Sequence, residues 1–284
     1  MKRKILLPTD FSKNAWHAIN YALELYKNDY CNFYILNVFS FTNNIIDSLI
    51  LMEPGSEMYE TAKLESENKL AKVLNMLTLN KQHNPKHHFE VISTFNSTVE
   101  AIKNIVEERD IDIIVMGTKG KTGSKTVIYG STAFNVMENV RNCPVIIVPE
   151  LAKHNVPKEI VFPTSYNTHL KRNELSHLIH LAKNCKASIL ILHVLEEAQL
   201  DKKQINNKKL LAECFEDVDH SFHTISFTAI PVAINCFVES RASDMIAFIN
   251  KKHFFFKSLL MQPLAKELSY HSKVPILVMH DLRN

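Results

Sequence analysis

The sequence predicts an α/β protein made of two tandem, doubly wound domains, each with a mainly five-stranded parallel sheet. Short apolar runs alternate with longer amphipathic segments along the chain. This alternation predicts right-handed βαβ crossovers, which make neighbouring strands parallel and cover both faces of the sheet with helices. The same order of segments occurs twice, and 284 residues are enough for two separate cores.

The first copy spans residues 1–150 and begins with an apolar run at 2–8, expected to be a buried strand. Ser12 is placed to cap a helix that reaches about Asn28, because apolar residues then recur at spacings of three and four. A long amphipathic helix is expected at 56–80. The remaining strands of this copy are expected at 33–40, 88–94, 111–117 and 144–149.

A short polar segment at 97–100, Ser-Thr-Val-Glu, has the spacing of a capping box. In that motif the Ser97 side chain accepts a hydrogen bond from the Glu100 amide, and the Glu100 side chain reaches back to the Ser97 amide. We therefore expect a helix to begin here, with Ile102 and Val106 on its apolar face.

The second copy, residues 158–284, repeats the first in a shorter form. Asp244 aligns with Asp112, and the copy is shorter by about two dozen residues, mostly around 198–220. Its first, second and last strands are expected within 159–167, 188–194 and 273–279. The boundary between the two domains is expected near 150–158.

Composition excludes several classes of function. The chain is 46% apolar and 22% charged with a formal net charge of +3, as in an ordinary globular protein. Neither half has the basic excess of a nucleic-acid binder, so no nucleic-acid partner is expected. No apolar run approaches the roughly 18 residues of a membrane span. The N-terminal apolar run is too short for a signal peptide, and the 5 scattered cysteines favour a cytoplasmic protein with reduced thiols.

The glycines are concentrated in one loop. Of the 5 in the chain, four are Gly117, Gly120, Gly123 and Gly130. Glycine tolerates positive φ and lets a ligand approach the backbone closely, so we expect this loop to bind the phosphates of a nucleotide. A helix beginning near Ser131 would point its unpaired amides and positive dipole end at the phosphates, and the hydroxyls of Ser131 and Thr132 could donate as well. The loop lysines could add charge or remain solvated.

A P-loop is a competing interpretation of the same residues. Gly120-Lys121-Thr122 matches the end of that motif, which requires a glycine five residues before its second glycine. Val115, inside the predicted strand, occupies that position. Phosphate binding here is therefore not expected to follow Walker geometry.

The spacing of these residues resembles the nucleotide-binding signature of the universal stress protein family. The pattern is Gly117-x2-Gly120-x9-Gly130-Ser131, after an apolar strand and before a helix and a strand that begins at Cys-Pro. The resemblance covers the whole chain as a tandem pair. It implies Rossmann-like domains of the adenine nucleotide alpha-hydrolase-like type, with ATP, ADP or AMP as ligand and magnesium on the phosphates.

The resemblance also implies an adenine side of the site, formed by Pro8, Thr9 and Asp10 and by the pair Asn37-Val38, of which Val38 is taken as the contact residue. Asp10 is either an acceptor beside the adenine and ribose or a carboxylate that caps the first helix near Ser12, and the two roles are compatible. Val38 and Met116 either line the base pocket or pack in the core as ordinary strand residues.

The second copy lacks this signature. No glycine occurs from residue 131 to the last residue, 284. A side chain in place of a glycine at positive φ is strained and can intrude on a ligand. The residues that stand at the positions of Asp10, Gly117, Gly120 and Gly130-Ser131 are Ser165, Ile249, Lys252 and the segment 261–263. We therefore expect one nucleotide site in the chain.

The leading functional hypothesis is a nucleotide-binding regulatory protein of the stress response. One alternative is an ATP hydrolase, at most slow, since no residue can be placed in line with a γ-phosphate from spacing alone. The other is an interaction module without nucleotide that uses the last strand and the aromatic patch Phe254–Phe256. Domains of the resembled family commonly pair through their last strands, which implies an internal pseudo-dimer, a possible homodimer and an unidentified protein partner.

Overall fold

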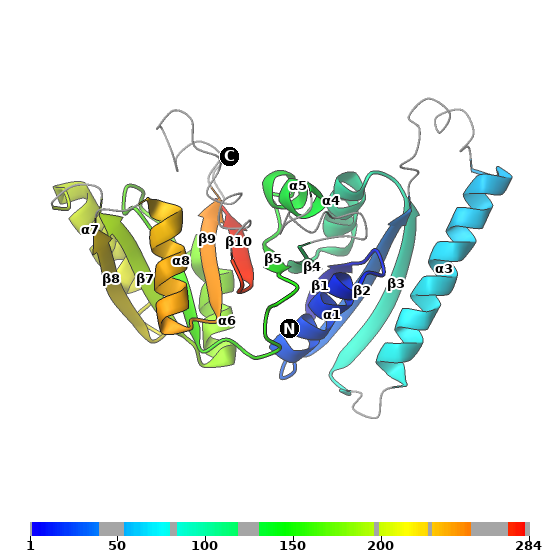
Figure 1. Cartoon of the computed structure of the whole chain (residues 1–284), viewed down its shortest axis with the longest axis horizontal. Helices are drawn as coiled ribbons and strands as arrows, with labels where there is room; N and C mark the ends of the chain where they lie inside the picture. The colour runs from blue at the N-terminus through cyan, green and yellow to red at the C-terminus, as the bar shows by residue number, and fades with distance from the viewer. Residues whose placement is uncertain are drawn as a thin grey trace.

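A computed structural model describes residues 2–39, 54–79, 84–118, 131–195, 199–226, 229–250 and 272–281. Within these ranges the strands form one continuous sheet in the order β3-β2-β1-β4-β5-β10-β9-β6-β7-β8 (Figure 1). No helix of the described ranges has the length and apolar character needed to cross a membrane.

The first half of the sheet contains five parallel strands in the order β3-β2-β1-β4-β5. All the strands expected in this half are present, and the first helix ends at Leu25, earlier than expected. The elements are β1 (Arg3–Pro8), α1 (Lys13–Leu25), β2 (Cys31–Phe39), α3 (Glu57–Thr78), β3 (His87–Phe95), α4 (Thr98–Arg109), β4 (Ile113–Gly117), α5 (Ser131–Asn139) and β5 (Val145–Val148).

The second half repeats this order as β8-β7-β6-β9-β10. Helix α7 has 13 residues where its counterpart α3 has 22, which accounts for part of the difference in length. The elements are β6 (Glu159–Pro163), the 3-10 helix η1 (Arg172–Leu175), α6 (Ser176–Cys185), β7 (Ser188–Leu195), α7 (Lys202–Cys214), β8 (His220–Ser226), α8 (Ile230–Arg241), β9 (Met245–Asn250) and β10 (Ile276–His280).

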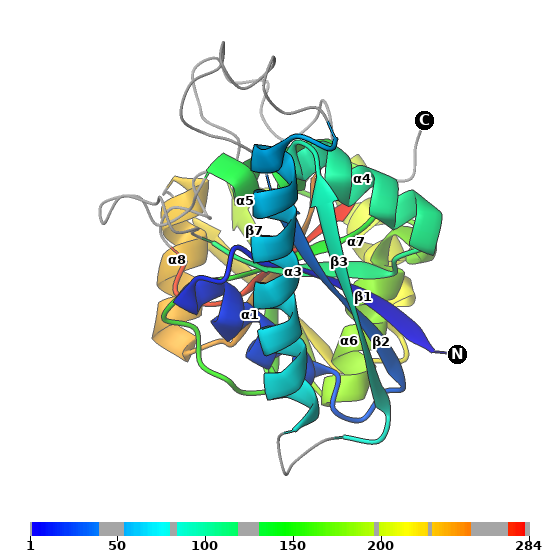
Figure 2. The same ribbon diagram turned by 90° about the vertical axis from the view of Figure 1, so that its right-hand side faces the viewer.

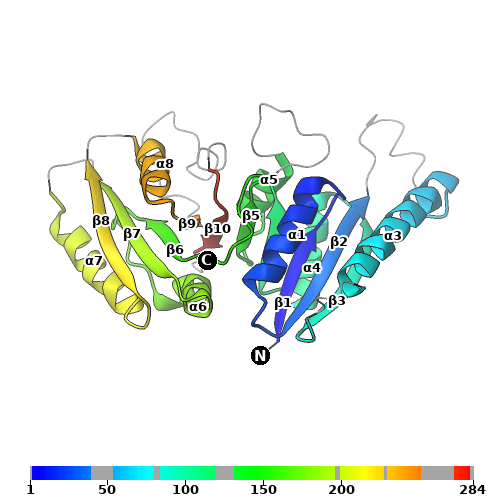
Figure 3. The same cartoon turned by 60° about the horizontal axis from the view of Figure 1, so that its bottom comes forward.

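Helices cover both faces of the sheet, as in a doubly wound fold. Alternate strand residues enter two separate cores: Ile5 and Leu7 pack with α1 and α3, whereas Leu6 packs with α4 and α5. Figure 3 shows α1 and α3 in front of the first-half strands, and Figure 2 shows α3 as the outermost element at its end of the molecule. Both cores continue into the second half.

The two halves join through their last strands. Strands β5 and β10 pair antiparallel, with Ile147 opposite Ile276, which is the internal pairing that the family resemblance led us to expect. Polar contacts extend the join beyond the strands: Arg141, which follows α5, donates to the Asn250 carbonyl at 3.0 Å and pairs with Asp281 at 2.8 Å. Helix α5 of the first half therefore reaches the carboxyl ends of β9 and β10.

Equivalent side chains in the two halves make equivalent bonds. Asp112 accepts a hydrogen bond from the Lys4 amide at 2.8 Å, which ties the start of β4 to the start of β1. Asp244 accepts from the amides of Lys158 and Glu159 at 2.8 and 3.2 Å and does the same for β9 and β6. The alignment of Asp244 with Asp112 is therefore confirmed at the level of contacts.

The predicted capping box is wrong. Ser97 is the N-cap of α4, but its side chain makes no bond to the helix amides. The Ser97 amide is bound by the Asn96 side chain at 2.7 Å, and the Glu100 carboxylate accepts from Lys103 at 2.9 Å. The motif would bring the Ser97 amide and the Glu100 carboxylate together, but here each is bound to a different neighbour.

Candidate functional site

The candidate site lies at the edge of the sheet where β1 and β4 end. Strand β1 pairs with β2 on one side and β4 on the other, so the crossovers leave β1 in opposite directions. In doubly wound sheets, ligands commonly bind outside the carboxyl ends of the strands at such a point. The register, with Leu6 opposite Ile114, brings Pro8 and Gly117 to the same edge.

A tight turn at 9–12 leads from β1 into α1. The Thr9 amide donates to the Leu36 carbonyl at 2.8 Å, and the Thr9 hydroxyl accepts from the Phe11 amide at 3.0 Å. Phe11 has φ of 63°, a conformation that a bulky side chain rarely adopts and that the surrounding bonds must hold in place.

Asp10 and Ser12 both stabilise the N-terminus of α1. Ser12 is the capping residue, and its hydroxyl accepts from the Ala15 amide at 3.1 Å. The half-buried Asp10 accepts from the Ser12 amide at 3.0 Å, so its carboxylate supports the capping residue without being the cap. The other role considered for Asp10, as an acceptor for a ligand, is compatible with this contact.

Gly117 touches the first turn of α1. A β-carbon on Gly117 would lie 2.8 Å from Asn14 Nδ2 and 2.9 Å from the Asn14 carbonyl oxygen. Asn14 Nδ2 also donates to the Thr118 hydroxyl at 3.0 Å, and both residues are buried. At this position the need for glycine therefore comes from the approach of the protein's own helix, and not from a left-handed backbone. Sequence reasoning missed Asn14 and Thr118.

The other predicted site residues are brought together only in part. Met116 is buried in the core beneath α4 and α5, and the half-buried Val38 packs against the same core. Thr132 is exposed in the first turn of α5, which begins at Ser131. Gly120, Gly130, the loop lysines Lys119, Lys121 and Lys125, and the patch Phe254–Phe256 lie outside the described residues.

A buried polar chain lies behind the turn; the family resemblance pointed to Asn37, but sequence reasoning missed the hydrogen bonds that Asn37 makes. Asn37 Nδ2 donates to the Thr9 carbonyl at 2.7 Å, and Asn37 Oδ1 accepts from the Ser66 hydroxyl at 2.7 Å. The hydroxyls of Ser66 and Ser93 are a further 2.7 Å apart. One signal was available, because Asn37 interrupts the run of apolar and aromatic residues from 33 to 39.

The second half builds the same turn with Pro163 and Thr164 at the positions of Pro8 and Thr9, but with Ser165 in place of Asp10. The Thr164 amide donates to the Leu192 carbonyl at 2.9 Å, Tyr166 has φ of 56°, and its amide donates to the Thr164 hydroxyl at 3.2 Å. His193 stands where Asn37 stands, with Nδ1 2.8 Å from the Thr164 carbonyl oxygen. A carbonyl only accepts, so Nδ1 of His193 is the protonated nitrogen.

Ile249 takes the place of Gly117 and is buried in the core. The second half has room for this side chain because its chain does not enter a helix directly. Helix α6 begins ten residues after Tyr166, whereas α1 begins two residues after Phe11. Loss of the glycine and displacement of the helix start therefore go together.

Titratable groups with altered pKa lie mainly at the join and in the core. Burial, and then the Arg141 guanidinium, lower the pKa of His280 to about 4. Burial and the charge of Asp29 raise the pKa of the Cys31 thiol to about 12, so this thiol is not a reactive nucleophile. Within the described ranges no group of three or more histidine, cysteine, aspartate or glutamate residues could hold a metal ion.

Two doubly wound halves, joined through their last strands and with a structured turn at the switch point, define a tandem α/β protein with parallel sheets. The family model described as the Universal stress protein family matches residues 1–149. The chain belongs to the universal stress protein family.

Known relatives agree with this assignment. Two universal stress proteins of Methanocaldococcus jannaschii are similar to this chain. One is 33% identical over 156 residues, covering 53% of this chain and 84% of that protein. The other is 30% identical over 158 residues, covering 52% of this chain and 95% of that protein.

Solved structures match the full tandem arrangement. A universal stress protein from Archaeoglobus fulgidus DSM 4304 has a TM-score of 0.73 at 18% identity, covering 98% of each chain. A putative universal stress protein from Pseudomonas aeruginosa UCBPP-PA14 has a TM-score of 0.64 at 9% identity, covering 98% of this chain and 93% of that one. At these identities the likeness shows the fold, and it extends over both halves.

Proposed function

We propose that this universal stress protein is a cytoplasmic regulatory protein of the stress response that binds one adenine nucleotide, ATP, ADP or AMP. In this proposal a first domain, 1–150, holds the nucleotide, and a second domain, 158–284, serves for structure and contacts. The observation that supports it most is the turn at 9–12, held beside Gly117 at the switch point. Parallel α/β sheets commonly bind ligands at such a point.

We assign the ligand contacts from the family resemblance, together with the position of the described residues at this edge. The adenosine side comprises Pro8, Thr9, Asp10, Val38 and Met116. The phosphate side comprises Gly117, Gly120, Gly130, Ser131 and Thr132. Phosphate groups suit the start of α5, since the first amides of a helix lack partners within the helix and carry its positive dipole end. Magnesium would be held chiefly by the nucleotide's own phosphates, as it commonly keeps few protein ligands.

The proposal places no nucleotide in the second half. Ile249 fills the position of Gly117, and Ser165 replaces the carboxylate of Asp10. Side chains from the first half also engage the carboxyl ends of the second-half strands, since the Asn250 amide donates to Glu138 at 2.9 Å. The second half is then free to serve as the pairing partner of the first, and to contact a second chain or another protein.

Calorimetric titration of the full chain, purified free of nucleotide, with ATP and magnesium tests the proposal. We expect one site per chain. Asp10→Asn keeps the oxygen that accepts from Ser12 and removes the charge, and it should weaken binding roughly tenfold or more, the value of a charge-assisted hydrogen bond. Ser165→Ala is the matched control in the second half and should leave the affinity unchanged.

Any of three outcomes would contradict the proposal. The first is the absence of any heat of binding by well-folded protein with ATP, ADP and AMP. The second is a stoichiometry of two nucleotides per chain. The third is an affinity that falls with Ser165→Ala and not with Asp10→Asn. Mass spectrometry of the small molecule that co-purifies with the chain would identify which of the three nucleotides it carries.

A further inference from the structure

We infer that Asn37 is a positioning residue for the nucleotide. It holds the carbonyl of Thr9 and thereby fixes the direction of the neighbouring Asp10 side chain, while Ser66 on α3 holds Asn37. This inference rests on the proposed function, because it concerns how the adenosine side of that site keeps its shape. Asn37 acts through the turn and is not itself assigned a contact with the ligand.

Each buried polar group in the chain around Asn37 has a hydrogen-bond partner in the protein. Asn37 and Ser66 are only 7% and 4% exposed, so their polar groups depend on protein partners. The amide nitrogen of Asn37 binds the Thr9 carbonyl, its oxygen binds Ser66, and Ser66 meets Ser93 on β3. A buried network in which each member has a partner allows one arrangement of its side chains. It therefore sets the position of Thr9 relative to β2, β3 and α3.

The turn at 9–12 that this network holds is conformationally strained. Phe11 adopts φ of 63°, which is unfavourable for a bulky side chain and persists only where its neighbours impose it. Thr9 is engaged through its amide, its hydroxyl and its carbonyl, and only the carbonyl bond comes from a side chain remote in sequence. Loss of Asn37 would therefore let the turn relax at its link to β2.

The second half has an equivalent side-chain bond to its turn carbonyl. His193 binds the Thr164 carbonyl at 2.8 Å, so pinning this carbonyl is a property of the fold. In the second half α7 also contacts the turn directly. Asn207 donates to the Tyr166 carbonyl at 2.7 Å, and Gln204 donates to the Ser165 carbonyl at 3.0 Å. In the first half α3 contacts the Phe11 ring through Lys69, at 5.7 Å from the ring centre, and reaches the Thr9 carbonyl through Ser66 and Asn37. Only the first-half turn carries a carboxylate, that of Asp10. Only in this half would holding the turn carbonyl in place orient a group that is proposed to bind the ligand.

The test uses calorimetry on the full chain with ATP and with AMP, each with magnesium. We expect Asn37→Leu, which is similar in size and cannot bond, to weaken both nucleotides about tenfold, the usual value of one lost buried hydrogen bond with its orientation. The affinities for ATP and for AMP should fall by the same factor, because the turn belongs to the proposed adenosine side and the two nucleotides share the adenosine. Asn37→His should restore binding to within about threefold, as His193 makes the same bond in the second half.

His193→Leu is the matched control, since it removes the same bond from a half without a proposed site. It should lower stability and leave the affinity unchanged. If Asn37→Leu does not fold, Ser66→Ala removes only the support behind Asn37 and should still weaken binding several-fold. Folding of each variant is checked by its thermal unfolding.

The outcomes separate the two proposals. No binding by the wild-type chain overturns the proposed function and this inference with it. Binding by the wild-type chain with unchanged affinity in Asn37→Leu or Ser66→Ala overturns the inference alone. An equal loss of affinity in His193→Leu also overturns it, because the effect would then be a general loosening of the fold.

Discussion

A β-carbon on Gly117 would lie 2.8 Å from the side-chain nitrogen of Asn14, so the end of β4 and the first turn of α1 meet at a distance that only glycine allows. The Asn14 amide then bonds the Thr118 hydroxyl next to that glycine. The edge of the candidate site and the start of α1 are therefore one packed unit, and a change in either should be felt by the other.

We predict that Gly117→Ala lowers the free energy of unfolding by about 1–3 kcal/mol, the usual cost of overpacking. The added methyl group meets both the side chain and the carbonyl oxygen of Asn14, so α1 must shift. Asn14→Ala in the same chain should recover only part of the loss, because the carbonyl oxygen remains. Urea unfolding of the two single variants and the double variant measures this coupling. Strictly additive losses would contradict the packing argument.

Local patterns predicted the regular elements well because each pattern is complete within a short stretch. Ser12 caps α1 as its position suggested, accepting from the Ala15 amide. The apolar runs became strands because they are buried on both faces of a parallel sheet. The capping box at 97–100 failed because nearby side chains, equally available in the sequence, compete for its two groups.

The contacts that shape the candidate site could not be predicted in the same way. Asn14 meets Thr118 across 104 positions of sequence, and Asn37 meets Thr9 across 28. No periodicity marks such pairs, since the side chains are brought together by strand register and helix packing. The glycine cluster drew attention to Gly117, where the structure shows the close approach of Asn14; the ligand contact inferred from the glycine stays a prediction.

The ion pair between Arg141 and Asp281 should hold the two halves together. Its side chains are 23% and 17% exposed, and Arg141 also donates to the Asn250 carbonyl. We expect Arg141→Ala to lower the free energy of unfolding by about 1–3 kcal/mol, because a partly buried carboxylate loses its partner. A double-mutant cycle with Asp281→Asn isolates the pair.

The pair Lys273 and Glu239 is a suitable control for this prediction. It has a similar distance, 2.9 Å, but its side chains are 71% and 60% exposed. Solvent screens such pairs, so Lys273→Ala should change the free energy of unfolding by no more than about 0.5 kcal/mol. Equal effects in the buried and exposed pairs would show that the join does not depend on Arg141.

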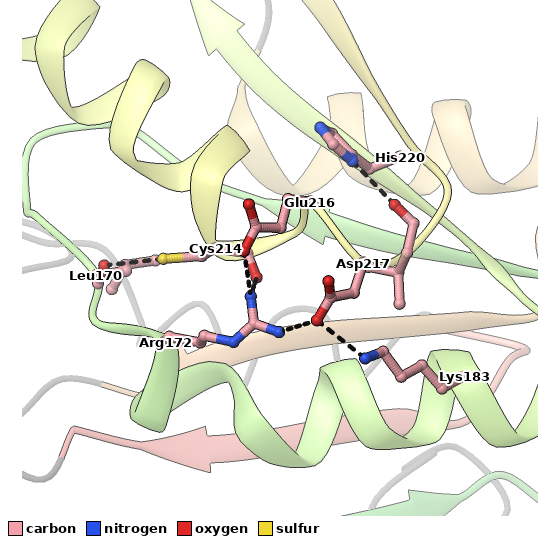
Figure 4. Close-up of polar contacts among 8 residues, drawn as sticks. Leu170, Arg172, Lys183, Cys214, Glu216, Asp217 and His220 are labelled. Carbon is pink, nitrogen blue, oxygen red and sulfur yellow. Dashed lines mark hydrogen bonds and ion pairs between the residues drawn. The ribbon is translucent and has the colours of Figure 1, made fainter.

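A second arginine should anchor the end of α7. Figure 4 shows Arg172 directed at the last turn of this helix: one guanidinium nitrogen donates to the Cys214 carbonyl at 2.9 Å, and another bonds Asp217. Lys183 also donates to Asp217, and these hydrogen bonds lower the pKa of that carboxyl group. Arg172 thus supplies a donor to a helix end whose carbonyls lack partners within the helix.

We predict that Arg172→Lys lowers the protection of the α7 carboxyl end against hydrogen exchange, with a loss of about 1 kcal/mol in local stability. A lysine offers one ammonium group and cannot reproduce the two directions of the guanidinium. Lys183→Ala, which removes only an exposed contact to Asp217, should leave the same amides within about 0.5 kcal/mol of wild type. Unchanged exchange in Arg172→Lys would mean that the helix end is held by packing alone.

The last prediction concerns acid and the buried His280 at the end of β10. Its side chain lies at the join and is buried beside the Asn250 backbone and Arg141. Burial and the nearby Arg141 lower its pKa to about 4, against 6.5 for a free histidine. Between these two values the unfolded chain binds a proton that the folded chain does not, so stability falls as the pH falls. The contribution is complete above pH 6.5.

The size of this effect follows from the two pKa values. Between pH 7 and pH 4 the folded state should lose about 3 kcal/mol relative to the unfolded state through this one residue. His280→Leu removes the titration, so the difference in unfolding free energy between wild type and variant should shift by that amount in favour of the variant on acidification. The other buried histidines are common to both proteins and cancel. Urea unfolding at pH 7, 5.5 and 4.5 measures the difference, and a pH-independent value would show that His280 is protonated equally in both states.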